Sequence, residues 1–125
     1  MNKQWVLIGA MSGFFGVVLG AFGGHFLKEK LSEHAFSIFE VGIRYHMWHA
    51  LALIALGVYG SHSGAGQINT YWPGMAFSLG IVLFSGSLYA LALTDLRFLG
   101  MITPIGGVAF LAGWAGFALL ALRSP

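Results

Sequence analysis

Long apolar blocks separated by a few charged residues are the dominant pattern of this chain. The longest block runs from Tyr45 to Thr94 without one Asp, Glu, Lys or Arg, and two others run from Gln4 to Gly24 and from Phe98 to Leu122. A membrane-spanning helix needs about 20 apolar residues, and a charge at the bilayer centre costs about 2.5–3.5 kcal/mol on insertion scales. The central block is too long for one crossing, so the pattern predicts four crossings.

Turn signals divide the central block and complete the predicted fold. A Gly/Ser/Asn-rich loop over residues 61–70 precedes Trp72-Pro73, and Thr103-Pro104 opens the last apolar block with proline in a first helical turn. We therefore predict an all-α integral membrane protein, an up-down four-helix bundle in a single domain over residues 1–125. The predicted helices cover about 5–27, 45–60, 72–94 and 103–122.

A shorter amphipathic pattern lies between the first two predicted crossings. Ser32 is a suitable N-cap, and the apolar residues after it repeat at helical spacing. These residues are Phe36, Phe39, Ile43 and Met47, whereas Glu33, Ser37, Glu40 and Arg44 occupy another face at helical spacing. Either one helix begins near Ser32 and protrudes from the membrane, or residues 32–43 form a separate short amphipathic helix at the interface with a break at Gly42. The sequence favours the separate segment.

Composition agrees with a membrane location and excludes several functions. The chain is 58% hydrophobic and 8% charged, with a mean hydropathy of +0.81, whereas soluble domains carry about 25% charged residues. Its net charge of +2 comes from very few ionisable groups, so no nucleic-acid-binding surface is expected. The absence of cysteine excludes disulfide and thiol chemistry.

Basic residues suggest how the chain is oriented in its membrane. The connections over residues 28–44 and 95–102 hold Lys28, Lys30, Arg44 and Arg97, whereas the terminal segments hold only Lys3 and Arg123. Because Lys and Arg are enriched in cytoplasmic loops, we expect both connections in the cytoplasm and both termini outside.

Small residues in the first and last predicted helices indicate close helix packing. Glycines at small-xxx-small spacing let another helix backbone approach closely in lipid. The glycines expected to do this are Gly9, Gly13, Gly16, Gly20, Gly24 and Gly113. Packing within the bundle is the favoured interpretation, and a homodimer seam is the alternative.

An up-down bundle would gather a group of polar side chains at the cytoplasmic end. The candidate cluster consists of His25, Tyr45, His46, His49, Tyr89, Asp95 and Thr103. An imidazole that faced hydrocarbon would leave its donor unpaired at a cost of about 1–3 kcal/mol. We therefore predict that His25 and His49 face each other inside the bundle, with the hydroxyls of Tyr45, Tyr89 and Thr103 as available partners.

The histidines leave three chemical interpretations open. The favoured one is structural, with the rings hydrogen-bonded to neighbouring backbone or hydroxyl groups. The second is proton or ion handling. The third is a metal site of His25, His46 and His49, or a haem held by His25 and His49. No cofactor is expected, and no nucleophile–base set is recognisable, so we do not expect an enzyme.

Ordered sequence motifs along nearly the whole chain resemble the Domain of Unknown Function 423 family. The motifs are Gly20 to His25, Tyr45 to Leu53, Leu83 to Leu93, Ile102 to Gly107 and Leu111 to Trp114. The family contains bacterial inner membrane proteins and resembles animal transmembrane protein 256; Gly24 departs from it, where alanine would be expected. The resemblance implies a small four-helix protein of the bacterial inner membrane without an established activity, and it assigns no catalytic residues. It places His25, His49, Ser85, Ser87, Tyr89, Thr103 and Pro104 in the defining motifs.

Two functions remain in view from the sequence. The favoured one is a structural or accessory membrane component, because of its glycine-lined faces and the absence of a buried charge pathway. The alternative is binding or translocation of a small ligand, proton or metal at the histidine-lined cytoplasmic end. The expected partners are the lipid bilayer and either other membrane proteins or a second copy of the chain, with no nucleic acid.

Overall fold

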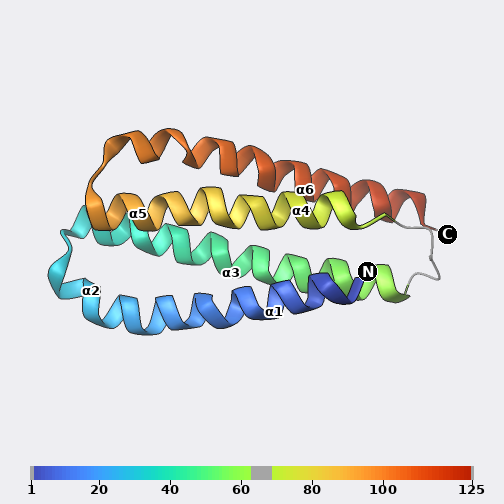
Figure 1. Cartoon of the computed structure of the whole chain (residues 1–125), viewed down its shortest axis with the longest axis horizontal. Helices are drawn as coiled ribbons and strands as arrows, with labels where there is room; N and C mark the ends of the chain where they lie inside the picture. The colour runs from blue at the N-terminus through green and yellow to red at the C-terminus, as the bar shows by residue number, and fades with distance from the viewer. Residues whose placement is uncertain (1, 63–68, 125) are drawn as a thin grey trace.

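The computed structural model describes residues 2–62 and 69–124, which form long helical rods without strands (Figure 1). The first rod consists of α1 (Asn2–Val18), the π-helical turn η1 (Leu19–Gly23) and α2 (Gly24–Lys30), and the second is α3 (Glu33–His62). The third rod consists of α4 (Tyr71–Gly80), the π-helical turn η2 (Ile81–Ser85) and α5 (Gly86–Thr94). The fourth consists of the 3₁₀ turn η3 (Arg97–Met101) and α6 (Thr103–Arg123).

Each of the four rods is long and apolar enough to cross a membrane. They run up and down, so that the α2–α3 and α5–α6 connections lie at one end and both termini at the other (Figure 1). The predicted all-α membrane fold is therefore confirmed. Of the loop predicted over residues 61–70, residues 63–68 lie outside the described part of the chain.

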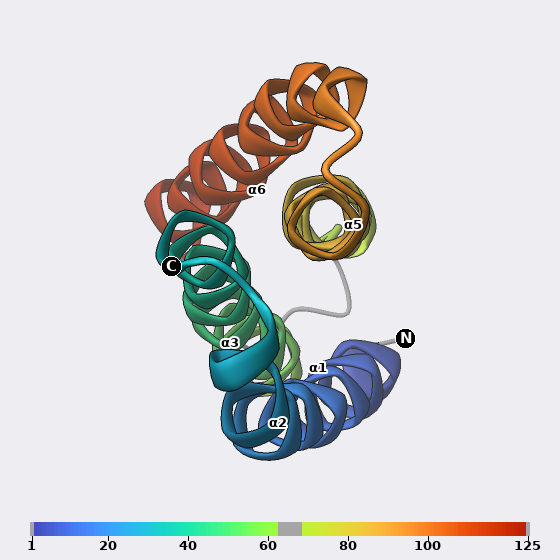
Figure 2. The same ribbon diagram turned by 90° about the vertical axis from the view of Figure 1, so that its left-hand side faces the viewer.

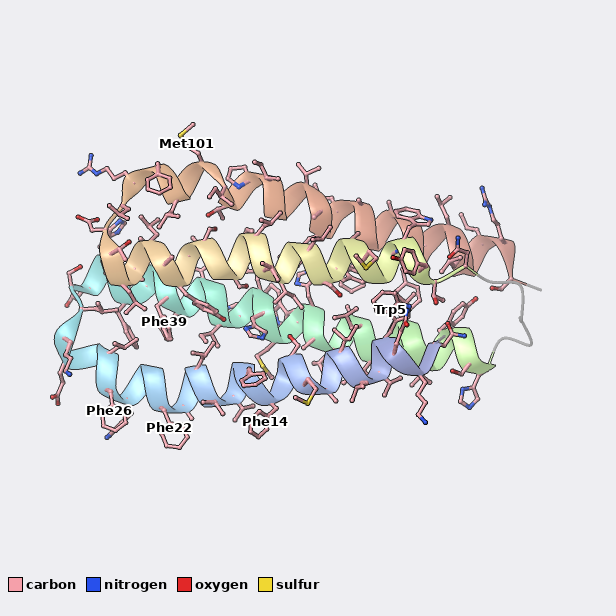
Figure 3. All side chains as sticks on the ribbon, in the orientation of Figure 1. Trp5, Phe14, Phe22, Phe26, Phe39 and Met101 are labelled. Carbon is pink, nitrogen blue, oxygen red and sulfur yellow. The ribbon has the colours of Figure 1, made fainter. Side chains whose placement is uncertain are left out.

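The rods are arranged as two hairpins that meet along their inner members. One hairpin pairs α1 with α3, and the other pairs the α4–η2–α5 rod with α6. Seen from the end, α1 and α6 lie on opposite outer sides, with α3 and α5 between them (Figure 2). The first rod therefore has a large outward face, on which Phe14, Phe22 and Phe26 point away from the bundle (Figure 3).

Helix α3 differs most from the prediction. It is continuous over 30 residues from Glu33, and the Oγ of Ser32 accepts a hydrogen bond from the backbone N–H of Ala35 at 3.1 Å. Gly42 is not a break, because it lies inside this continuous helix. A Cβ there would lie 2.7 Å from the ring of Tyr89, so the glycine lets α5 approach closely. Residues 32–43 are thus not a separate interfacial helix, and those from 33 onward form the first turns of α3. Their charged face coexists with an apolar face that packs on α5.

Glycines hold α1 close to α3, although not all of those expected take part. A Cβ at Gly9 would lie 2.7 Å from the backbone oxygen of Ala50. Gly16 and Gly20 also belong to this contact between the first rod and α3, since they lie against Met47 and Ile43 respectively. In the other hairpin, Gly113 on α6 lies against Phe77 on α4.

Gly13 and Gly24 are exceptions, since a Cβ at either would meet nothing within 4 Å. The π-helical turn η1 explains the position of Gly24. A π turn inserts an extra residue into the helical repeat, and Gly23 therefore faces α3, where a Cβ would lie 2.8 Å from Phe39.

Trp5 anchors the end of α1 that lies near α4. Its side chain is 1% exposed and belongs to the apolar core with Leu53, Leu56 and Phe77, and Figure 3 shows it pointing into the bundle. The indole N–H donates to Thr70 Oγ1 at 3.1 Å. This buried bond joins the first rod to Thr70, the N-cap residue of α4, at the end opposite the α2–α3 connection.

The C-cap of α5 supplies a testable feature of the backbone. Asp95 adopts φ 58° and ψ 24°, and its N–H donates to the carbonyl of Leu91 at 2.8 Å. This left-handed conformation costs a typical L-residue about 1–2 kcal/mol, less for Asp, and glycine adopts it freely. Asp95→Gly should raise the free energy of unfolding by about 0.5 kcal/mol and Asp95→Ala should lower it by about 1 kcal/mol. Denaturant unfolding in micelles measures both; an alanine variant more stable than the glycine variant would contradict the assignment.

Candidate functional site

Two histidines lie near the middle of α3 and inside the bundle. His46 is 6% exposed and His49 is 4% exposed. They are three residues apart and contact different neighbours, His46 the α1 and α5 helices and His49 the α6 helix. Because α3 begins at Glu33, both lie well inside the bundle and not at the helix start, where the sequence had placed them.

His46 joins three rods through its two ring nitrogens. Its Nε2 lies 2.8 Å from the backbone oxygen of Ser12, and its Nδ1 lies 2.8 Å from the hydroxyl of Tyr89. A carbonyl oxygen only accepts, so Nε2 carries a proton and donates to it. On the neutral ring, Nδ1 then accepts from the Tyr89 hydroxyl. The ring thus connects α1, α3 and α5.

His49 has the opposite tautomer, and its partners define it fully. Its Nδ1 lies 2.7 Å from the backbone oxygen of Tyr45 and therefore donates. Its Nε2 lies 3.0 Å from Trp114 Nε1, and an indole N–H only donates, so Nε2 must accept. The ring also stacks on Phe110, with centroids 3.5 Å apart and an interplanar angle of 9°. Neither nitrogen retains a lone pair for a ligand.

Two serines connect the third rod to its neighbours. The Oγ of Ser85, which is fully buried, donates to the backbone oxygen of Gly42 on α3 at 2.7 Å. The Oγ of Ser87 lies 2.6 Å from Thr103 Oγ1 on α6. The π turn η2 ends at Ser85 and also contains Phe84, whose backbone contacts Gly106 on α6. The η2 turn therefore contacts both adjacent rods within two residues.

The predicted polar cluster does not assemble as one group. His46 pairs with Tyr89, and Thr103 pairs with Ser87. Tyr45 is a partner of His49 through its backbone oxygen and through a parallel ring 6.2 Å away, not through its hydroxyl. Two predicted members lie apart: Asp95 is exposed at the end of α5, and His25 is exposed on α2 with its ring against Phe26.

His25 and His49 do not face each other, contrary to the sequence prediction. The early start of α3 moves His49 several turns away from the bundle end at which His25 lies. Over residues 2–62 and 69–124, no three His, Cys, Asp or Glu side chains converge in a way that could hold a metal ion. The proposed three-imidazole set and the haem held by His25 and His49 therefore do not form.

Sequence reasoning missed two of the groups that the histidines contact. The Ser12 carbonyl is a backbone group and leaves no signal in a side-chain pattern. Trp114 was treated as part of an apolar helix, although its indole N–H is a donor that needs a partner inside a membrane. Ser85 and Ser87 entered only through the family resemblance.

Comparison with known proteins decides the family. The family model described as "Protein of unknown function (DUF423)" matches residues 19–107. The chain belongs to the DUF423 family. Its relatives include a UPF0382 membrane protein of Staphylococcus haemolyticus, 49% identical over 90% of this chain and 89% of that protein. No solved structure matches the chain.

Two further DUF423 relatives cover almost the whole chain. The UPF0382 membrane protein YwdK of Bacillus subtilis is 40% identical over 97% of this chain and 98% of its own length. The UPF0382 inner membrane protein YgdD of Escherichia coli K12 is 43% identical over 98% of this chain and 93% of its own length. This DUF423 chain is thus a small multi-pass membrane protein of a family whose description assigns no activity.

Proposed function

We propose that this DUF423 protein is a structural or accessory component of the bacterial inner membrane and not an enzyme. One observation carries the proposal: both ring nitrogens of His46 and of His49 are taken by groups of the protein itself. Polar groups inside a membrane are costly unless paired. The hydrogen bonds of His46 and His49 pair these groups and connect helices of the bundle. The name of the E. coli relative supports the inner membrane as the location.

The proposed partners are the bilayer and either another membrane protein or a second copy of the chain. The outward face of α1 and α2 supports this, because Phe14 is 61% exposed, Phe22 61% and Phe26 62%. No nucleic acid is expected as a partner, given the low charge of the chain.

Native purification tests the proposal. The tagged chain is expressed at a low level, cross-linked in intact cells and then solubilised in mild detergent. We expect a complex larger than one chain and of fixed stoichiometry. A monomer with a stoichiometric metal or a visible Soret band would instead support the alternative, in which the histidines bind a ligand.

The orientation is proposed from the position of the basic residues. Lys28 and Lys30 end α2, and Arg97 begins η3, so they belong to the two connections at one end of the bundle (Figure 1). The positive-inside tendency favours the cytoplasm for that end. A C-terminal alkaline phosphatase fusion should be active and a C-terminal fluorescent-protein fusion dark. Fusions after Leu96 should give the opposite pair of results. A fluorescent C-terminal fusion would show that the C-terminus lies in the cytoplasm and would contradict the proposed orientation.

A further inference from the structure

A groove of about 590 Å³ lies between α3 and α6. Most of the side chains that line it carry a ring, and these are Tyr45, Trp48, His49, Phe84, Phe110 and Trp114. The volume is within the range of about 300–1,000 Å³ that small-molecule sites occupy. Beyond the groove, toward the C-terminus of α6, the hydroxyls of Tyr59 and Ser124 are hydrogen-bonded.

The position of the groove along α3, and therefore within the bilayer, restricts what can enter it. Tyr45 and Trp48 lie near the middle of the 30-residue helix α3, which is roughly 45 Å long at 1.5 Å per residue. The hydrocarbon layer is about 30 Å thick, so a groove at this position opens to lipid. An occupant must therefore be soluble in the membrane.

Two hydrogen-bond donors in the groove have no partner within the described ranges. Tyr45 and Trp48 line it, and neither the Tyr45 hydroxyl nor the Trp48 indole N–H bonds to a described group of the protein. Trp114, by contrast, donates to His49. Trp is usually found at the membrane–water interface, and an unpaired donor in hydrocarbon costs several kcal/mol. The groove therefore matches an occupant that brings hydrogen-bond acceptors.

We propose that this groove binds the ring of an isoprenoid quinone. A quinone ring is planar, which suits an aromatic lining, and its carbonyls are acceptors for the Tyr45 hydroxyl and the Trp48 N–H. The isoprenoid tail would lie along the apolar sides of the groove at Leu51 and Leu111. A phospholipid does not meet these requirements, because its ester carbonyls lie at the interface and only acyl chain reaches this depth. The inference goes beyond the structural role and does not depend on it.

Gly107 allows the groove to be filled without disturbing the fold. It lines the groove, and a Cβ there would come no nearer than 3.9 Å to another atom, on the ring of Phe84. Gly107→Leu should therefore place a side chain in the groove. Gly13→Leu is the matched control, because Gly13 lies outside the groove and a Cβ there meets nothing within 4 Å.

The test uses the full chain in nanodiscs of quinone-free phospholipid, titrated with a decyl-substituted benzoquinone. Quinones quench indole fluorescence, and Trp48 and Trp114 both line the groove. We expect a saturable quenching component that Gly107→Leu abolishes and Gly13→Leu retains. Tyr45→Phe keeps the ring and removes the donor, so it should weaken binding about 2–10-fold, as expected for one hydrogen bond. Circular dichroism checks that each variant is folded.

Decylbenzene, which has the chain and a ring but no carbonyl, separates quinone binding from general apolar occupancy. It should not compete with the decyl-benzoquinone at equal concentration. Quenching without a saturable component, equal competition by decylbenzene, or unchanged binding in a folded Gly107→Leu variant would each overturn the proposal.

Discussion

Replacing Gly106 by alanine should lower the free energy of unfolding by about 1–3 kcal/mol, the usual cost of overpacking. A Cβ at Gly106 would lie 2.7 Å from the backbone Cα of Phe84, and backbone atoms cannot rotate away as a flexible side chain can. The α6 helix would have to move from η2, which would weaken the Ser87–Thr103 contact as well.

The neighbouring glycine provides a control with the same chemical change. A Cβ at Gly107 meets the Phe84 ring only at 3.9 Å, an ordinary contact. Gly107→Ala should therefore leave stability unchanged or raise it by up to about 1 kcal/mol, because alanine is the better helix former. Unfolding of both variants in mixed micelles measures the difference. Equal free energies of unfolding for Gly106→Ala and Gly107→Ala would show that Gly106 of α6 does not pack closely against the backbone of Phe84.

Replacing His49 by alanine should have the largest effect of any change at the two histidines. It removes a ring that stacks on Phe110 and leaves the N–H of Trp114 without its acceptor. Large-to-alanine changes of buried rings cost about 3–5 kcal/mol. His49→Phe should cost less, about 1–3 kcal/mol, because it keeps the ring and loses only the hydrogen bonds.

His25→Ala is the matched control for His49→Ala. His25 was predicted to lie beside His49, but its side chain is exposed on α2, and exposed substitutions usually change stability by less than about 0.5 kcal/mol. The same micelle unfolding assay measures both variants. A His25→Ala variant as unstable as His49→Ala would contradict the observed separation of the two rings.

The sequence was sufficient for the number of candidate crossings and for their up-down arrangement, because charge is costly in lipid and the apolar blocks are plain. It was misleading for the start of α3. Glu33, Glu40 and Arg44 read as the polar face of an interfacial helix, whereas packing of Phe39 and Gly42 against Tyr89 keeps the helix continuous. Tertiary contacts of this kind cannot be read from the pattern of one segment.

The candidate site was predicted only in part. Tyr89 was predicted as an available partner of His25 and His49, but its hydroxyl contacts His46. The position of His25 depended on the helix ends, which the sequence placed wrongly for α3. The π turn η1 has no sequence signal in a 3.6-residue repeat, and for this reason Gly23 and not Gly24 faces α3.

The central claim is that His46 and His49 are internal connectors whose four ring nitrogens are all occupied. Nitrogen NMR of ¹⁵N-histidine-labelled protein in nanodiscs at neutral pH, with and without added Zn²⁺, tests it directly. The account predicts two neutral rings of opposite tautomer, His46 protonated at Nε2 and His49 at Nδ1, with signals that Zn²⁺ does not change; His25, His34 and His62 are the exposed references. Two rings of the same tautomer, or signals of either buried ring that shift with Zn²⁺, would contradict it.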